Sequence, residues 1–165
     1  MKKLTLAIGV LLAGASAGAA VFFIIAQPLR ESNDKGEEVR QNLFPVLIAD
    51  ALIHVEVAAS LVQQVRGLSG RAGLAADQGM LFVYDEPGLR SFWMKDMNFP
   101  IDIIWIGKDR RVIDVDAGVR PDSYPQTFQS PAPAQFVLEV NAGMAEHQGI
   151  VPGAFVDLSG IPLLR

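Results

Sequence analysis

Residues 101–117 read IDIIWIGKDRRVIDVDA and indicate two antiparallel strands joined by a tight turn. Short runs in which apolar and polar residues alternate are typical of strands, and they flank a turn signal here. The turn is predicted at Gly107-Lys108-Asp109-Arg110, because Gly tolerates positive φ and Asp favours turns. This stretch therefore predicts a β-hairpin over about 101–107 and 111–117.

The same pattern, punctuated by Gly, Pro and Asp, continues on both sides of this hairpin. It predicts further strands near 50–58, 80–84, 90–95, 134–140 and 154–158. The segment 120–133 contains four prolines and no hydrophobic period, so we expect a surface loop there.

Two short helices are expected between these strands. Ser60 and Gln63 have the spacing of a capping box. Asn141 is a candidate N-cap for a second helix that runs to about His147, and Gly149 is placed to end it. The predicted fold class is mainly β with two short helices (α+β), a compact and mostly antiparallel sheet or barrel-like domain behind an N-terminal transmembrane or signal helix.

The N-terminal part of the chain predicts export. Residues 4–26 are 23 consecutive residues without a charge, and Lys2 and Lys3 precede them. About 20 apolar residues suffice to cross a bilayer as a helix. A cleaved signal peptide is the alternative, with a possible cleavage site at 15–17, but the apolar run continues beyond that point and favours an uncleaved anchor.

The predicted organisation is a signal anchor or signal peptide at 1–26, a polar linker at 27–45 and a globular domain at 46–165. The positive-inside bias keeps the lysines in the cytoplasm and exports the rest. We therefore expect a protein of the bacterial cell envelope, with its domain in the periplasm, anchored in the inner membrane or secreted if the segment is cleaved.

Composition excludes several classes of function. The chain has no cysteine, so it has no disulfide, thiol nucleophile or lipid-bearing cysteine. Residues 46–165 hold nine basic and fourteen acidic residues, a formal net charge of −5, which argues against nucleic acid as a partner. No metal or other cofactor is predicted, because His54 and His147 lie 93 positions apart and neither has a short-spaced ligand.

Four ordered blocks of sequence resemble a known family. They are 66–71 (RGLSGR), 79–84 (GMLFVY), 91–103 (SFWMKDMNFPIDI) and 136–143 (FVLEVNAG). Together they are similar to the DUF192 (UPF0127) family over about residues 52–160. The resemblance implies a compact, mostly β domain that is often exported in bacteria, and it implies no established activity. Asp96 and Met97 stand where the family commonly has Asn and Thr.

The block around Trp93 is the first candidate for a binding site. On a strand, Phe92 and Met94 point to one face, and Trp93 and Lys95 point to the other. If that second face is solvated, Trp93 beside Lys95 and Asp96 suits stacking on a sugar ring. The alternative is a buried Trp93 whose indole N–H finds a carbonyl.

Two further groups of charged residues are candidates. Asp96 and Asp102 bracket a turn, and a carboxylate pair about 5–9 Å apart can hydrolyse glycosides. Aspartates at turns more often accept hydrogen bonds from backbone amides.

Arg66 and Arg71 flank Gly67-Leu68-Ser69-Gly70, which suits an anion-accepting loop. Glu139 lies within an apolar strand and needs a partner if it is buried. An internal Arg–Glu ion pair is therefore the structural alternative for these residues.

These patterns leave three functions open. The first is a non-catalytic ligand-binding or accessory domain of the envelope, the second a carbohydrate-active enzyme that uses paired carboxylates, and the third a protein-interaction module. The expected partners are the membrane, through the N-terminal helix, and an envelope glycan or protein. The candidate ligand-binding residues are Arg66, Arg71, Trp93, Lys95, Asp96, Asp102 and Glu139.

Overall fold

The computed structural model describes residues 43–162, which form a mainly β domain with two short α-helices. The strands are β1 (Phe44–Ile48), β2 (Ala51–Ala58), β3 (Gln78–Gly88), β4 (Ser91–Trp93), β5 (Ile101–Ile106), β6 (Val112–Val119), β7 (Thr127–Gln129), β8 (Ala134–Asn141) and β9 (Val156–Asp157). The helices are α1 (Leu61–Arg66) and α2 (Met144–His147), with a 3₁₀ turn, η2, at Pro121–Ser123. The predicted class, mainly β with two short helices, is confirmed.

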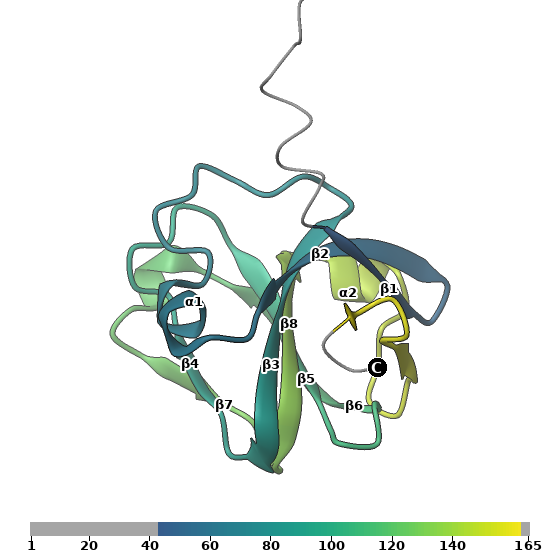
Figure 1. The fold of residues 1–165 in the computed structure, drawn as a ribbon. Helices are drawn as coiled ribbons and strands as arrows, with labels where there is room; N and C mark the ends of the chain where they lie inside the picture. The colour runs from purple at the N-terminus through teal and green to yellow at the C-terminus, as the bar shows by residue number, and fades with distance from the viewer. Residues whose placement is uncertain (1–42, 163–165) are drawn as a thin grey trace, which may run out of the picture. The chain divides into compact units, whose positions relative to one another are not determined.

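Seven strands form one sheet in the order β6-β5-β8-β3-β2-β1-β9, and β4 and β7 form a separate antiparallel pair. The β2–β3 pair is parallel, and every other pair of neighbouring strands is antiparallel. β3 and β8 run side by side through the middle of the domain (Figure 1). The expectation of a mostly antiparallel sheet therefore holds.

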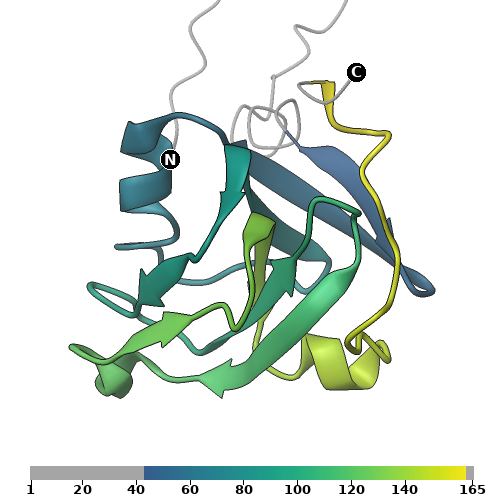
Figure 2. The ribbon, with the colours of Figure 1, turned by 90° about the horizontal axis from the view of Figure 1, so that it is seen from below.

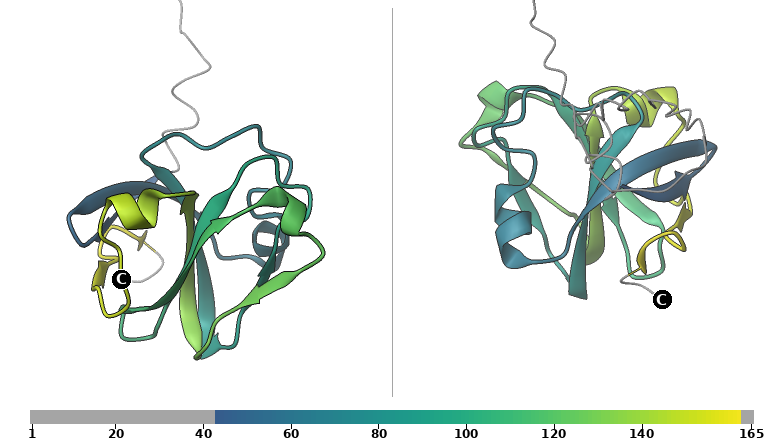
Figure 3. Two further views of the ribbon diagram at one scale, coloured as in Figure 1. Left: turned by 180° about the vertical axis from the view of Figure 1, so that it is seen from behind. Right: turned by 45° about the horizontal axis from the view of Figure 1, so that its top comes forward.

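The sheet curls into a half-barrel, and the segment around β9 contacts both of its edges. β9 pairs with β1 on one side. On the other side, Phe155 forms a bridge with Arg111, and the N–H of Val112 donates to the carbonyl of Ala154 at 2.9 Å. The C-terminal segment thus lies between β1 and the start of β6 (Figure 3).

Two hydrophobic cores lie on opposite sides of the β3–β8 pair. One contains residues of β1, β2 and β9 together with Ala145 of α2. The other contains Phe82, Met94 and Trp105, and it lies on the side of α1, β4 and β7. Figure 2 shows α1 and α2 at opposite ends of the domain. The two opposite faces of β3 and β8 therefore supply two separate packing surfaces.

The predicted hairpin at 101–117 is correct. Gly107 donates its N–H to the carbonyl of Arg111 at 2.9 Å, and Arg110 donates to Gly107 at 3.0 Å. The strands expected near 50–58, 80–84, 90–95, 134–140 and 154–158 correspond to β2, β3, β4, β8 and β9. β1 was not predicted, and it includes Phe44 and Pro45, which the sequence assigned to the linker. β7 lies inside the expected loop at 120–133, because its three residues pair with β4.

The helix predictions are confirmed in position but not in every cap. Ser60 and Gln63 form the complete capping box of α1. α2 ends at His147, and Gly149 has a φ of 66°. The N-cap of α2 is Gly143, so the assignment of that role to Asn141 is wrong. Asn141 instead donates its side-chain amide to the carbonyl of Ala75 at 2.9 Å.

The predicted signal anchor at 1–26 and most of the predicted linker lie outside the described residues. Within residues 43–162, no helix is long and apolar enough to cross a membrane.

Candidate functional site

Strand β4 places its side chains on two faces, as the alternation of its sequence predicts. Phe92 packs edge to face against Phe82 and Trp105, with ring centroids 4.8 and 5.4 Å apart. Met94, next along the chain, is buried. Trp93 points the other way and is 52% exposed, so the alternative of a buried core tryptophan is wrong. An exposed indole beside a packed aromatic core is therefore available to a ligand.

Helix α1 lies across from β4 and has no buried residue of its own. Its capping box fixes the start of the helix, and Gln64 donates its side-chain amide to the carbonyl of Val83 at 2.8 Å, which ties the helix to β3. Leu61 and Val65 are 74% and 65% exposed. The helix is thus held to the sheet by a polar contact and leaves apolar side chains free.

A pocket of about 270 Å³ lies between α1, the loop after it and β4. Its walls are mainly apolar and aromatic, and a few polar side chains reach into it. The lining residues are Leu61, Gln64, Val65, Arg66, Gly67, Leu68, Ser69, Phe82, Tyr84, Ser91, Phe92, Trp93, Met97 and Glu139. Such a concave, apolar site with a few polar groups is the usual form of a small-molecule site.

Glu139 is the acidic residue of the pocket, and its side chain is buried at the middle of the sheet. In the strand register, Glu56 lies opposite Met80, and Met80 lies opposite Glu139, so these three side chains share one face. Glu139 is 5% exposed, and its Oε2 has no hydrogen-bond partner among residues 43–162. Burial raises the pKa of Glu139 to about 8, although the charge of Arg71 opposes the shift. Burial therefore favours the neutral acid form of Glu139.

Arg71 forms its ion pair with Glu56 and not with Glu139. Its Nη2 lies 2.8 Å from Glu56 Oε2, and the second guanidinium nitrogen bonds the other carboxylate oxygen. This bidentate hydrogen bond lowers the pKa of Glu56 and raises that of Arg71. The expected internal pair between an arginine and Glu139 is thus wrong, because the guanidinium of Arg71 is paired with Glu56 on β2.

Most backbone amides of the loop between Arg66 and Arg71 are used by carbonyls of the domain. The N–H groups of Gly67, Ser69 and Gly70 donate to the carbonyls of Gln63, Arg66 and Asp96 at 2.8, 3.1 and 2.8 Å. The N–H of Arg71 donates to Leu68 at 3.2 Å. These four N–H groups are therefore already used within the domain, which leaves less support for the hypothesis of an anion-accepting loop of backbone amides.

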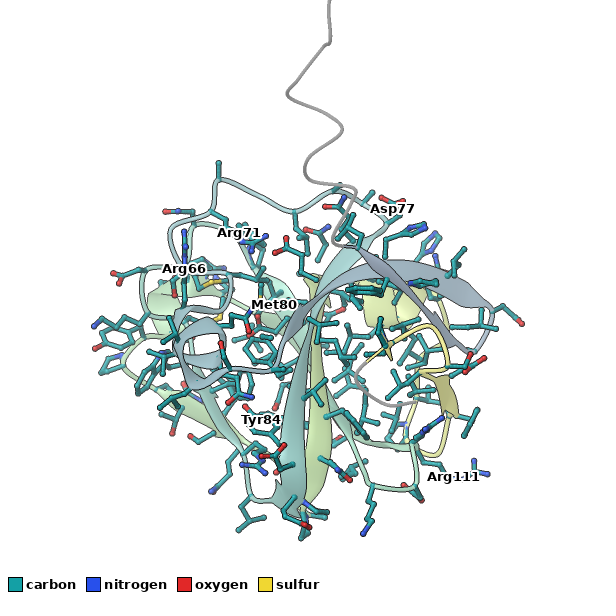
Figure 4. All side chains as sticks on the ribbon, in the orientation of Figure 1. Arg66, Arg71, Asp77, Met80, Tyr84 and Arg111 are labelled. Carbon is teal, nitrogen blue, oxygen red and sulfur yellow. The ribbon has the colours of Figure 1, made fainter. Side chains whose placement is uncertain are left out.

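Arg66 remains available. It lines the pocket, and no described residue forms an ion pair or hydrogen bond with its guanidinium. Figure 4 shows Arg66 and Arg71 on the same side of the domain, whereas Arg111 lies at the far side beside the β5–β6 turn. Arg66 is thus the one cation that lines the pocket among the residues that the structure describes.

Asp102 has a structural role. Its side chain is fully buried, and its Oδ1 accepts the N–H groups of Gly118 at 2.8 Å and Gly143 at 3.1 Å. Its Oδ2 accepts the N–H of Ala145 at 2.9 Å, in the first turn of α2. Asp102 is therefore engaged by backbone amides, which is the structural alternative for a turn aspartate, and it does not line the pocket.

Asp96 and Lys95 lie beside the pocket without lining it. Both are exposed, and Asp96 has a φ of 57°. Their backbone carbonyls hold the loop after α1, since Lys95 accepts the hydroxyl of Ser69 at 2.9 Å and Asp96 accepts the N–H of Gly70 at 2.8 Å. Of the seven predicted residues, the pocket therefore brings together Arg66, Trp93 and Glu139.

The comparisons with known proteins agree with this architecture. A family model, DUF192 ("Uncharacterized ACR, COG1430"), matches residues 46–158. The chain belongs to the DUF192 family. No curated protein matches it.

Two solved structures share the DUF192 fold. A protein of unknown function from Novosphingobium aromaticivorans is 33% identical over 70% of this chain and 84% of that chain, with a TM-score of 0.67. A protein from Sinorhizobium meliloti described as a putative transcription regulator is 29% identical over 72% of this chain and 95% of that chain, with a TM-score of 0.68.

Several residues of this DUF192 pocket were not singled out from sequence. Tyr84 lies in it, and the guanidinium carbon of Arg90 stacks 3.7 Å from the centroid of its ring. Gln64, Met97 and Phe82 also line it. Tyr84 and Phe82 stand in the block 79–84, where alternation along one strand would have pointed to a shared face. Gln64 and Met97 carried no such signal.

The residues that the structure describes hold no group of three His, Asp or Glu side chains placed to bind a metal ion. His54 Nδ1 lies 3.2 Å from Asp77 Oδ2 on the surface, away from the pocket between α1 and β4.

Proposed function

We propose that this chain is a non-catalytic ligand-binding or accessory domain whose site is the pocket between α1 and β4. The observation that carries the proposal is the buried Glu139, which lines the pocket together with the exposed Trp93 and whose Oε2 has no hydrogen-bond partner among the described residues. A buried polar atom without a hydrogen bond costs about 1–3 kcal/mol. A ligand that supplies the missing partner recovers that cost.

The walls of the pocket favour a ring-shaped or apolar body. Phe82, Phe92 and Trp93 provide aromatic surface, and Gln64, Ser69 and Arg66 provide polar groups near it. A flat ring that stacks on Trp93 and carries polar substituents satisfies both kinds of surface. An envelope glycan is one ligand of this form.

We place this domain in the bacterial cell envelope, exported and tethered to the inner membrane. The support is the uncharged run at 4–26 after Lys2 and Lys3, followed by a polar stretch. The Sinorhizobium protein is described as a putative transcription regulator. A role in binding nucleic acid has little support in this chain, because residues 46–165 have a formal net charge of −5.

The test is thermal denaturation of the full chain, purified in a mild detergent, with envelope glycans, muropeptides, nucleotides, inorganic anions and divalent cations. A ligand of the native state at about a hundred times its Kd adds about 2.7 kcal/mol and raises Tm by several degrees. We expect one class to raise Tm in the wild type and not in Trp93→Ala.

The matched control is Phe155→Ala, because Phe155 is also 52% exposed but does not line the pocket. It should respond to the ligand as the wild type does. A panel without any shift, or a shift that survives Trp93→Ala, would remove the proposal.

A protein-interaction module is the second candidate, and the outer side of α1 favours it. Leu61, Val62 and Val65 are 74%, 78% and 65% exposed, and Leu61 and Val65 line the same pocket as the exposed Trp93. Clustered exposed apolar side chains mark interaction surfaces. Photo-crosslinking in intact cells from residue 62 tests it, with residue 151 on the other side of the domain as control. Absence of any reproducible product specific to residue 62 would exclude this candidate.

The carbohydrate-active enzyme has less support. Its two-carboxylate mechanism needs a second acid near the first. Among the described residues that line the pocket, Glu139 is the only acid, and Asp102 is occupied by backbone amides.

A further inference from the structure

We infer that the pocket selects a small organic carboxylate, whose oxygens accept a hydrogen bond from the neutral acid of Glu139 and pair with the guanidinium of Arg66. This inference rests on the proposed ligand-binding function and names the chemical class of the ligand. Three features of the described residues carry it: the state of Glu139, the free charge of Arg66 and the apolar walls.

Glu139 is prepared to donate a hydrogen bond. It is 5% exposed, and its Oε2 is without a partner. The ionisable groups that face it are Glu56 on β2, Tyr84 on β3, Arg66 at the end of α1 and Arg71 in the following loop. Since Arg71 is already paired with Glu56, no cation fully compensates a charge on Glu139. The acid form is therefore favoured, and its O–H is a donor that needs an acceptor.

The positive charge of Arg66 favours a ligand with a negative charge. Its guanidinium is exposed at the pocket and has no ion pair with any described residue, while the charge of Arg71 is balanced by Glu56. With Glu139 neutral, the groups that line the pocket carry one positive charge. A cation is therefore repelled, and an anion gains a charge-assisted hydrogen bond.

The loop after α1 argues for a carboxylate over a phosphate. Sites for phosphate usually offer several free backbone N–H groups. In this loop, the N–H groups of Gly67, Ser69 and Gly70 are used by carbonyls. One guanidinium and one acid O–H match the two oxygens of a carboxylate.

The size and walls of the pocket set the body of the ligand. About 270 Å³ bounded by Phe82, Phe92 and Trp93 accommodates one six-membered ring or a short chain. A ring acid therefore fits both ends of the site, with its carboxylate toward Glu139 and Arg66 and its face against the aromatic side chains.

The test is isothermal titration calorimetry of the full chain with three probes of one shape: benzoate, benzyl alcohol and benzylamine. At pH 6.5 we expect benzoate to bind at least tenfold more tightly than either of the others. Benzoate is ionised at both pH 6.5 and pH 9.5. A change of its affinity between these values therefore reflects an ionisation of the protein and not of the probe. Since the pKa of Glu139 is about 8, its ionisation should weaken benzoate binding about 30-fold at pH 9.5.

Three variants assign the effect to residues. Glu139→Gln keeps a donor without an ionisable group, so it should bind benzoate at pH 6.5 and lose the pH dependence. Arg66→Gln should weaken benzoate at least tenfold and leave benzyl alcohol unchanged. Arg111→Gln removes a similar charge from the far side of the domain and should behave as the wild type (Figure 4). Far-ultraviolet circular dichroism verifies that each variant is folded.

The outcomes separate this inference from the proposed function. Preference for benzylamine, equal binding of all three probes, or benzoate binding unaffected by Glu139→Gln at pH 9.5 and by Arg66→Gln overturns the carboxylate inference. If a ligand without a carboxylate raises Tm in a Trp93-dependent way while benzoate does not bind, the proposed function stands and this inference fails. If neither benzoate nor any member of the thermal panel binds, both fail.

Discussion

Asp102 and Glu139 are two buried acids on adjacent strands, and they differ in their hydrogen bonds within the domain. In the register of β5 and β8, Asp102 lies opposite Val140 and Glu139 lies opposite Ile103, so the two acids face opposite sides of the sheet. On the side of α2, three backbone N–H groups surround the carboxylate of Asp102. On the side of α1, Glu139 lines a pocket, and its buried Oε2 has no hydrogen-bond partner among the described residues.

The difference separates a structural acid from a candidate binding residue. A buried carboxylate that accepts several amides stabilises the folded chain, and its removal leaves those amides unsatisfied. A buried acid without a partner destabilises the folded chain, because the unfolded chain hydrates it. An acid that destabilises the folded chain and lines a pocket is a candidate for ligand binding. The role of Asp102, by contrast, is explained by its hydrogen bonds within the fold.

The largest effect expected at pH 7 tests the structural role of Asp102. Asp102→Ala removes the acceptor of Gly118, Gly143 and Ala145, and we expect the free energy of unfolding to fall by about 4 kcal/mol. Equilibrium unfolding in urea measures it. Asp102→Asn keeps one acceptor oxygen and should lose less. A loss below about 1 kcal/mol in Asp102→Ala would mean that the three amides find other partners.

The second expected effect is a dependence of stability on pH that is caused by Glu139. The pKa of Glu139 is raised from 4.5 to about 8 by burial. Between these values the unfolded chain is ionised at this residue while the folded chain is not, so the free energy of unfolding falls as pH rises, and it levels off above pH 8. We expect a total fall on the order of 5 kcal/mol from this residue.

Glu139→Gln should lack this dependence and become more stable than the wild type at pH 9. Urea unfolding of both proteins at pH 5 and pH 9 gives the comparison. Parallel changes in the two proteins would show that Glu139 is solvated in the folded state.

A smaller effect concerns the ion pair that keeps Arg71 away from Glu139. Its hydrogen bond with Arg71 lowers the pKa of Glu56, so the pair contributes stability above pH 4.5 that is lost as pH falls through the lowered pKa. Because both side chains are about one third exposed, we expect Arg71→Met to cost only about 1 kcal/mol at pH 7. The cost should shrink in acid. Urea unfolding at pH 7 and pH 3 measures both, and a cost that does not change with pH would assign it to packing.

The smallest expected effect on stability is that of Trp93→Ala. Because the ring is 52% exposed, its loss should change the free energy of unfolding by less than about 0.5 kcal/mol. The same urea experiment on Phe155→Ala provides a control of equal exposure. A loss of 2 kcal/mol or more would make Trp93 part of the core and weaken its role as a contact for ligand.

Much of the fold could be predicted from the sequence because it rests on local signals. The hairpin at 101–117 and the capping box at Ser60 depend on residues within a few positions of one another. β1 and β7 were missed because such short strands are stabilised by their partners, and β7 has three residues in a proline-rich segment. The cap of α2 was misassigned because its acceptor, Asp102, comes from another strand.

The site was predicted in part, for a similar reason. Alternation along β4 identified the face of Trp93, and the apolar neighbours of Glu139 indicated its burial. The partner of Arg71 could not be read from sequence, because the choice between Glu56 and Glu139 depends on a row of side chains across three strands. The closure of the pocket by α1 depends likewise on a contact between Gln64 and Val83.

The position of β9 gives the last residues of the domain a protective role. Unpaired strand edges invite pairing with other chains and so promote aggregation. The segment around Val156–Asp157 covers β1 on one edge of the sheet and the start of β6 on the other. One short piece of chain therefore shields two edges at once, and its release would turn a self-contained domain into a template for self-association at both ends of the sheet.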